Sequence, residues 1–328
     1  MTSASIPLRD LTALVRPDLD RVAAELVEDL RPEQSDLLPF VEHAASYQGK
    51  QLRAALVFLA PRALGLETGD DHVEVAKIIE LLHTATLVHD DVLDGAMIRR
   101  QESTINAEHG TELPVLLGDY IYARAFHMSV QLGDSTCSRV LADVTRRICQ
   151  GEITQIIHRF DFDWTVERYD EVIRDKTALL YGAACRLGAH YSGAPAASCE
   201  ALDRFGVELG MAFQIVDDCL DIDGDETVVG KSLGTDLGKG KLTLPLLWLM
   251  REPAKRDELR ALMEGSSTDA DKLERLHSGF DVRGAVDFAH AAAERRVRDA
   301  IDSVDGLLDG SAKDAMLGIA DYVLTRRR

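Results

Sequence analysis

Two acidic clusters of the form Asp-Asp-x-x-Asp are the residues of this sequence best suited to chemistry. Their carboxylates are Asp90, Asp91, Asp94, Asp217, Asp218 and Asp221. On a helix, residues four apart lie about 40° apart around the axis, so the first and last carboxylates of each cluster share a face. Such close carboxylates repel one another unless a cation holds them, and oxygen ligands suit Mg²⁺ together with substrate phosphate oxygens. Two facing clusters could therefore hold one diphosphate through shared magnesium ions.

A solvated acidic helix end is the simpler explanation for one such cluster. Here the motif occurs twice, and each copy follows a strongly apolar run, over residues 78–89 and 205–216. An exposed acidic face is not expected at the end of such a run. The repetition favours a site.

Basic residues flank both clusters, although the chain as a whole is acidic. The candidates are Lys50, Arg53, Arg99, Arg100, Lys176 with its neighbour Thr177, Lys231 and Lys241. Each alone is more simply a surface charge, but a diphosphate needs several cations. His83 lies two helical turns before Asp90 and could point into the same cavity, although a lone histidine is more often a core residue.

The elements that must position these residues are predicted to be helices. Apolar residues recur at helical spacing almost throughout, and alternating β-branched runs bounded by hairpin turns are absent. We expect an all-α protein, with residues 1–328 forming a single domain. No stretch reaches about 18 uncharged apolar residues, so no transmembrane segment is expected.

Composition narrows the function and the compartment. Lys plus Arg is 37 and Asp plus Glu is 56, which gives a net charge of −19 and argues against a nucleic-acid partner. The five cysteines include no C-x-x-C pair, so neither a disulfide framework nor a zinc site is indicated. A cytoplasmic protein is expected.

From residue 49 to the C-terminus the chain resembles the trans-prenyltransferases, or polyprenyl synthetases, and within them the octaprenyl diphosphate synthase-like long-chain bacterial enzymes. The motifs that carry the resemblance are Gly49 to Arg53, His83 to Asp91, Arg99-Arg100, Lys176 to Ala178, Phe213 to Asp218, and Gly230-Lys231 through Lys241 to Pro245. Six ordered motifs at similar spacing make chance a poor explanation.

The resemblance implies an isoprenoid-synthase helical bundle around a central cavity, usually a homodimer. It assigns all six clustered aspartates to Mg²⁺, three ions when substrate is bound. It assigns isopentenyl diphosphate to Lys50, Arg53, His83 and Arg100. It assigns the allylic diphosphate to Arg99, Lys176, Thr177, Gln214, Lys231 and Lys241. Among these, Lys176 and Lys231 also count as catalytic, because they face the leaving diphosphate.

Two departures from the family pattern put loop geometry in doubt more than binding. The family's Gly-Gly-Lys-Arg-x-Arg-Pro is here Gln48-Gly49-Lys50-Gln51-Leu52-Arg53-Ala54, and its Arg-Arg-Gly ends in Gln101. Both cation pairs are retained.

The implied reaction is head-to-tail condensation of isopentenyl diphosphate with an allylic diphosphate. Short-chain family members place a bulky aromatic four or five residues before the first aspartate, where this chain has Thr86 and Ala85. The next obstructions toward the start of the helix are Leu82 and then Ile78 or Ile79. We expect a medium-chain or long-chain product of more than twenty carbons, with geranylgeranyl diphosphate as the alternative.

Three other readings remain to be weighed. A terpene cyclase would not need the isopentenyl-binding cations. A non-catalytic subunit of a heteromeric prenyl synthase would be expected to have lost carboxylates from one cluster, yet both are intact. A structural helical bundle explains none of the charged pattern.

Overall fold

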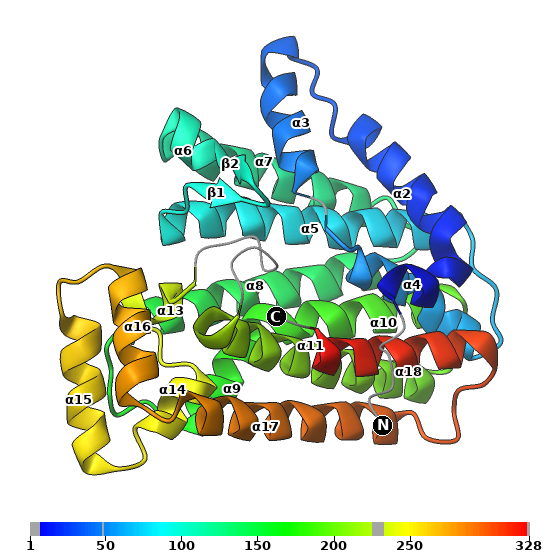
Figure 1. Ribbon diagram of the computed structural model, residues 1–328. Helices are drawn as coiled ribbons and strands as arrows, with labels where there is room; N and C mark the ends of the chain where they lie inside the picture. Colours follow the sequence, from blue (N-terminus) through cyan, green and yellow to red (C-terminus); the bar gives the residue numbers. More distant parts are fainter. Residues whose placement is uncertain (1–6, 48, 225–232, 327–328) are drawn as a thin grey trace.

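The computed structural model describes residues 7–47, 49–224 and 233–326, and most of these residues are helical (Figure 1). The N-terminal half contains α1 (Leu8–Leu11), α2 (Arg16–Asp29), α3 (Leu38–Ser46), α4 (Leu52–Ala63), α5 (Asp70–Asp94), α6 (Ile105–His109), α7 (Glu112–Ser129) and α8 (Thr136–Ile157). The rest contains α9 (Val166–Ile173), α10 (Leu179–Tyr191), α11 (Ala196–Asp223), α13 (Thr235–Gly238), α14 (Leu244–Leu249), α15 (Pro253–Glu264), α16 (Asp269–Gly279), α17 (Val282–Ser303) and α18 (Gly310–Thr325). The all-α prediction is confirmed.

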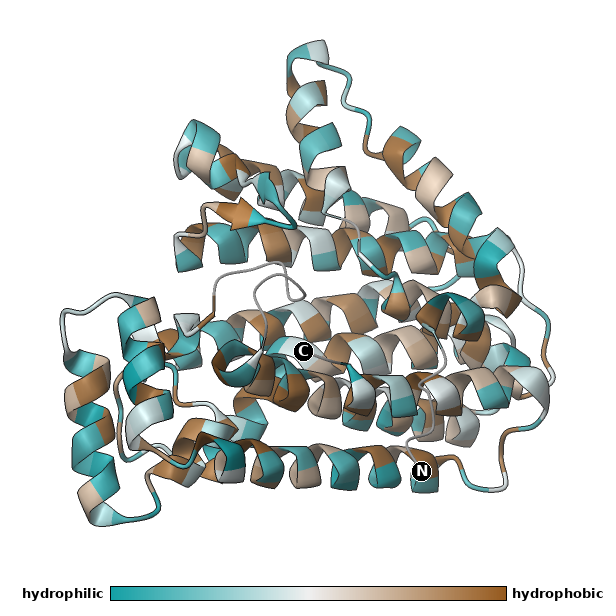
Figure 2. Cartoon of the chain, in the orientation of Figure 1, coloured by the Kyte–Doolittle hydropathy of each residue, from teal (hydrophilic) through white to brown (hydrophobic). Residues whose placement is uncertain are grey.

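The helices pack in layers. Helices α5 and α7 lie together above α8, α10 and α11, and α17 lies below α11 (Figure 1). Most helices carry hydrophobic and hydrophilic residues side by side (Figure 2), as expected of amphipathic helices that bury one face. Helix α4 is an exception, because ten of its twelve residues are buried. It therefore runs through the core.

Two glycines allow helix α10 to approach its neighbours closely. A Cβ atom at Gly188 would collide with the backbone carbonyl of Val57 in α4, and one at Gly206 of α11 would collide with the backbone of Tyr181. Only glycine fits where two helix backbones come this near. These contacts fix α10 between α4 and α11.

Both acidic clusters lie in the last turns of long helices, α5 and α11. The carbonyl groups at a helix C-terminus carry partial negative charge, so carboxylates there are unfavourable unless cations neutralise them. Neither last turn contains a basic residue of its own. The neutralising charges must therefore come from other segments.

A short hairpin follows α5 and was not expected from the sequence. Strand β1 (Ile98–Arg99) pairs antiparallel with β2 (Glu102–Ser103), through a two-residue turn at Arg100 and Gln101. Both turn residues have positive φ, of 53° and 69°, as a type I′ turn requires. Gln101 thus takes a left-handed conformation at the position where the family has glycine, which resolves the uncertainty about this loop.

No helix among the described residues is both long enough and apolar enough to cross a membrane.

Candidate active site

In the first acidic cluster, Asp91 has a different environment from its neighbours. Its side chain is almost fully buried and forms a two-point ion pair with Arg99, with Nε and Nη2 at 2.9 and 2.7 Å from Oδ1. Asp90 and Asp94 are only partly buried. The sequence assigned Asp91 to metal and Arg99 to the allylic diphosphate, and in the structure these two residues lie in contact with each other.

Asp94 is surrounded by cations from distant segments. Lys241 and Lys239 each place Nζ 3.1 Å from its Oδ1. Arg159, which follows α8, has Nη2 at 3.9 Å from the same oxygen. Burial alone would raise the pKa of Asp94, but the lysines outweigh it and lower that pKa to about 2. Asp94 is therefore ionised under all ordinary conditions.

At Asp90, the effects of burial and of a neighbouring cation on the pKa oppose each other. Burial raises its pKa, and the nearby charge of Lys176 opposes that shift. Lys176 itself is bound to Glu152 of α8 and donates to Gln155 Oε1 at 3.2 Å. A second cation close to Asp90 would favour its charged form, so this carboxylate is suited to metal binding.

Lys176 and Thr177 lie on a π-helical segment, η3 (Arg174–Ala178), between α9 and α10. Such segments are rare and frequently occur at functional sites. The Thr177 hydroxyl donates to Gln214 Oε1 at 2.8 Å, and Gln214 Nε2 donates to Asp218 Oδ1 at 2.8 Å. The two neighbours thus connect to different clusters: Lys176 to the first and Thr177 to the second.

In the second cluster, all three carboxylates contact other groups of the protein, and two of them are buried. Asp218 is buried and accepts hydrogen bonds from the Tyr169 hydroxyl at 2.6 Å and from Gln214. Burial, together with the nearby Asp236, raises its pKa. Asp221 is also buried, and accepts from Thr235 Oγ1 and from the backbone N–H of Asp236, both at 3.0 Å. Asp217 is partly exposed and lies 3.4 Å from Arg326 Nη2.

A chain of contacts joins the two clusters. Asp236, whose backbone binds Asp221, has its carboxylate 3.7 Å from Lys241 Nζ. Lys241 in turn binds Asp94 of the first cluster. Lys241 is nearly buried, with 8% of its side chain exposed, so its position is well determined by its neighbours. The sequence alone could not show that the segment after the second cluster returns to the first.

The residues expected to hold isopentenyl diphosphate lie around a buried carboxylate, Glu80. Burial raises the pKa of Glu80 while Arg53 and Arg100 oppose the shift. Burial and the same arginines lower the pKa of His83 well below its usual value, so its imidazole is neutral. The Arg53 guanidinium stacks on the Tyr181 ring at 4.3 Å. Three of the four predicted residues, Arg53, His83 and Arg100, therefore share one electrostatic environment.

Lys50, the fourth predicted residue, lies at the edge of this group. Its Nζ donates to the Tyr322 hydroxyl at 2.7 Å. Tyr322 belongs to α18, the C-terminal helix of the described chain. Arg100 lies directly against Gly49, where any Cβ atom would collide with its guanidinium. The family-like Gly-Lys pair thus packs against the hairpin arginine.

Several site residues escaped the sequence analysis: Glu80, Glu152, Gln155, Arg159, Lys239 and Arg326. The two glutamates offered a signal, because each is an isolated charge on an apolar helical face. Both proved to be buried, with 3% and 9% exposure. Arg159, Lys239 and Arg326 offered none, since only tertiary packing brings them near the clusters.

The residues predicted to limit chain length lie on α5. Ala85 and Leu82 are buried, as are Ile78 and Ile79, and none of the four is aromatic. Thr86 is partly buried and its hydroxyl donates to the His83 carbonyl at 2.7 Å. Lys231 lies outside the described residues.

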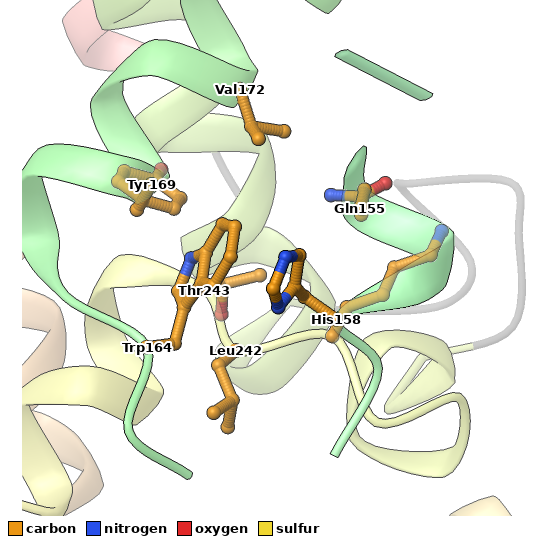
Figure 3. A pocket seen from close by; sticks show the side chains of 8 residues that line it. Gln155, His158, Trp164, Tyr169, Val172, Leu242 and Thr243 are labelled. Atoms are coloured by element: carbon orange, nitrogen blue, oxygen red, sulfur yellow. The ribbon is translucent and has the colours of Figure 1, made fainter. Parts of the chain in front are cut away.

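A small cavity, shown in Figure 3, is lined by Gln155, His158, Trp164, Tyr169, Val172, Leu242, Thr243 and Lys241. Its volume is about 20 Å³, which is room for about one water molecule. The Thr243 hydroxyl is buried without a hydrogen-bond partner in the described structure. The cavity is too small for a substrate and suits a structural water.

The donor set fits a magnesium ion that shares its coordination with a substrate. Among the described residues, no three metal-ligating side chains already converge on one point. Mg²⁺, however, commonly uses one or two carboxylates and completes its shell with water and phosphate oxygens. Asp90, Asp94 and Asp217 have accessible oxygens for this purpose. These three side chains are only partly buried, although Asp94 and Asp217 also contact cations of the protein, whereas Asp91, Asp218 and Asp221 are buried.

The comparisons with known proteins point to one family. Residues 34–278 match the family model described as polyprenyl synthetase. The chain is 35% identical to an octaprenyl diphosphate synthase of Escherichia coli (strain K12), over 98% of this chain and 99% of that protein. It is 34% identical to heptaprenyl diphosphate synthase component 2 of Geobacillus stearothermophilus, over 96% and 98% of the two chains.

Solved structures agree with the sequence comparisons. A polyprenyl synthase from Caulobacter crescentus CB15, complexed with calcium and isoprenyl diphosphate, superposes with a TM-score of 0.91 at 30% identity, covering 99% of this chain and 100% of that one. A decaprenyl diphosphate synthase from Rhodobacter capsulatus gives 0.89 at 32% identity, covering 98% and 100%. The predicted isoprenoid-synthase fold is confirmed by these likenesses.

Proposed function

The chain belongs to the polyprenyl synthetase family, and from this premise we propose how its site condenses isopentenyl diphosphate with an allylic diphosphate. It is a prenyltransferase that makes a medium-chain or long-chain all-trans product. The observation that carries the assignment of the site is the contact chain from Asp221 through Asp236 and Lys241 to Asp94, which joins both acidic clusters around shared cations.

The step that depends most on electrostatic stabilisation is the departure of the diphosphate group from the allylic substrate. Negative charge develops on the diphosphate as the C–O bond breaks. Lys176 lies near Asp90 and Lys241 joins the two clusters, so both could stabilise that charge. Lys231, by its position in the family motif, would add a third lysine. Lys176 and Lys241 are positioned before the reaction by Glu152, Asp94 and Asp236.

Magnesium would be held by Asp90, Asp94 and Asp217, and it supplies Lewis-acid stabilisation of the leaving diphosphate. Three ions in the substrate complex are part of this proposal. Asp91, Asp218 and Asp221 then act as supports, because their hydrogen bonds orient Arg99, Gln214 and the 233–241 segment.

Isopentenyl diphosphate would lie against Lys50, Arg53, His83 and Arg100. Positive charge from the arginines attracts its diphosphate, and neutral His83 can donate one hydrogen bond without adding charge. When the double bond of isopentenyl diphosphate is held near the reacting carbon of the allylic substrate, the two molecules no longer have to meet by diffusion in the right orientation. The proton lost after condensation passes most simply to the departing diphosphate.

A homodimer is proposed as the functional assembly. Large apolar side chains are exposed along α7 and α8, which pack against each other: Leu116, Phe126, Val130, Ile153 and Ile157. Exposed apolar surface on neighbouring helices is typical of a protein interface. A second copy of the chain is the partner we propose for this surface. A cytoplasmic location is proposed because all five cysteines are free thiols.

The direct test is a product assay. The purified protein is incubated with magnesium, isopentenyl diphosphate and farnesyl diphosphate, and the products are separated by chain length. We expect linear polyprenyl diphosphates of more than twenty carbons. Cyclic hydrocarbons, or no consumption of isopentenyl diphosphate, would refute the proposal.

A further inference from the structure

Asp94 is contacted by more cations than one carboxylate can balance. Lys241 is shared with Asp236, so its charge is compensated within the protein. Lys239 and Arg159 have no other carboxylate within ion-pair distance among the described residues. In a chain with a net charge of −19, three cations around one carboxylate are unusual. They suit an anion that carries more than one negative charge.

Arg159 also has donors that the protein does not use. Its Nε and Nη2 atoms are buried and have no hydrogen-bond partner in the described structure. Leaving a buried donor unpaired is energetically unfavourable. Unpaired donors of this kind are expected where a bound ligand supplies the hydrogen-bond acceptor. Phosphate oxygens are suitable acceptors, because their geometry matches the planar guanidinium.

The position of Arg159 is enforced by its neighbour. Phe160 adopts a left-handed backbone with φ of 61°, which is unfavourable for an aromatic residue. Its N–H donates to the Gly240 carbonyl at 2.8 Å, and its ring lies where any Cβ atom at position 240 would be. The segment after α8 is thereby fastened to residues 239–241. This packing brings Arg159 to the same carboxylate as Lys239.

We infer that Arg159 and Lys239 form an additional anchor for the diphosphate group of the allylic substrate, beside the lysines of the family motifs. The inference rests on the proposed function of the site. In the free protein the two cations hold Asp94. When the diphosphate binds, its oxygens accept hydrogen bonds from both cations, and Asp94 is released from them.

The test measures diphosphate binding without catalysis. Inorganic pyrophosphate is titrated into the full-length protein by calorimetry in EDTA, so that only protein cations can hold it, and then in magnesium. The variants are Arg159→Gln, Lys239→Gln and Arg159→Lys. The matched control is Arg146→Gln, because Arg146 lies on α8 in an exposed ion pair with Asp143. Melting temperatures verify folding.

We expect Arg159→Gln and Lys239→Gln each to weaken pyrophosphate binding about tenfold in EDTA, the loss of one charge-assisted contact. The KM for the allylic substrate should rise by a similar factor while that for isopentenyl diphosphate stays within about twofold. Arg159→Lys should recover part of the affinity, because it keeps the charge and loses the planar fork. Arg146→Gln should match the wild type.

Any of three results would refute the proposal that Arg159 and Lys239 bind the diphosphate. These are that the wild type binds no pyrophosphate in EDTA, that both glutamine variants keep the wild-type affinity, or that the Arg146→Gln control loses as much affinity as they do. A purely structural role for Arg159 would lower the melting temperature and leave the pyrophosphate affinity of the folded protein unaltered. Failure of the proposed function is distinguishable, because it would abolish product formation by the wild type whatever the pyrophosphate titration shows.

Discussion

Arg99 and Asp91 face each other across the turn between α5 and β1, with the guanidinium Nη2 2.7 Å from Oδ1 of the carboxylate. Asp91 is buried, and its neighbour Asp90 is only partly so. Two adjacent aspartates of one motif therefore lie in different environments. Asp91 is bound to Arg99 of the hairpin, and we propose that Asp90 is the one that binds a metal.

If Asp90 binds a metal and Asp91 holds the hairpin, replacing Asp90 should impair catalysis and replacing Asp91 should impair stability. Asp90→Ala should lower turnover by about a hundredfold or more, because a ligand for the leaving-group metal is lost, while the melting temperature stays nearly unchanged. Asp91→Ala should lower the free energy of unfolding by about 3 kcal/mol, because the partly buried Arg99 loses its partner. Turnover assays and thermal denaturation of both variants test these two expectations. Similar melting temperatures for both variants would contradict this assignment of roles.

The two substrate sites should respond to different substitutions. Arg100→Ala should raise the KM for isopentenyl diphosphate about tenfold or more, and Lys241→Ala that for the allylic diphosphate, since each removes a charge-assisted contact. Steady-state kinetics with each substrate varied in turn gives the answer. If both variants impair the same substrate to the same degree, the separation of sites is wrong. We expect Lys231→Ala, like Lys241→Ala, to raise the KM for the allylic diphosphate.

Product length should depend on Ala85. Short-chain relatives carry an aromatic residue at this point of the helix, and here the position holds a buried methyl group. Ala85→Phe should shorten the product to fifteen or twenty carbons and keep the first condensation, because the ring fills the space that a growing chain would need. Chromatography of the products tests this. An unchanged product distribution would mean that the chain does not pass Ala85.

The stability of the protein should depend on pH through His83. Burial, followed by the field of Arg53 and Arg100, lowers the pKa of this histidine well below 6.5, the value of an unperturbed side chain. The unfolded chain therefore binds a proton near that pH and the folded chain does not. The stabilisation is complete above pH 6.5 and is lost as the pH falls, by up to about 1.4 kcal/mol per pH unit.

Urea denaturation of the wild type and His83→Gln between about pH 7 and pH 5 measures this effect. The glutamine variant should lose less stability on acidification than the wild type. His127→Gln, at an exposed position of α7, is the control and should follow the wild type. Parallel curves for the wild type and His83→Gln would rule out the neutral histidine.

The proposed dimer surface is tested by charge. Leu116→Asp and Phe126→Asp place carboxylates on the exposed apolar side chains of α7, and the double variant should elute as a monomer, because an unpaired charge cannot be buried cheaply in an interface. Val166→Asp, at an exposed position of α9, is the matched control. Multi-angle light scattering gives the mass of each. A wild-type protein that is already monomeric at micromolar concentration would disprove the dimer.

The sequence by itself determined the class of fold and the family, and it predicts metal chemistry for the two clusters. Helical spacing of apolar residues is a local property, so it predicted the all-α architecture, and the repeated Asp-x-x-x-Asp spacing fixed which carboxylates share a face. It also contained the family motifs, because these are short and ordered along the chain. The hairpin after α5 was missed, since two-residue strands leave no alternating pattern.

Only the tertiary structure decided how the charges are distributed among partners. Asp91, Asp218 and Asp221 look equivalent to Asp90 in the sequence, but burial and hydrogen bonds from other segments give them different environments. Arg159 and Lys239 carry no motif at all. They reach Asp94 because Phe160 packs on Gly240, eighty residues away in the chain. Such contacts depend on the packing of distant segments, which local sequence patterns do not encode.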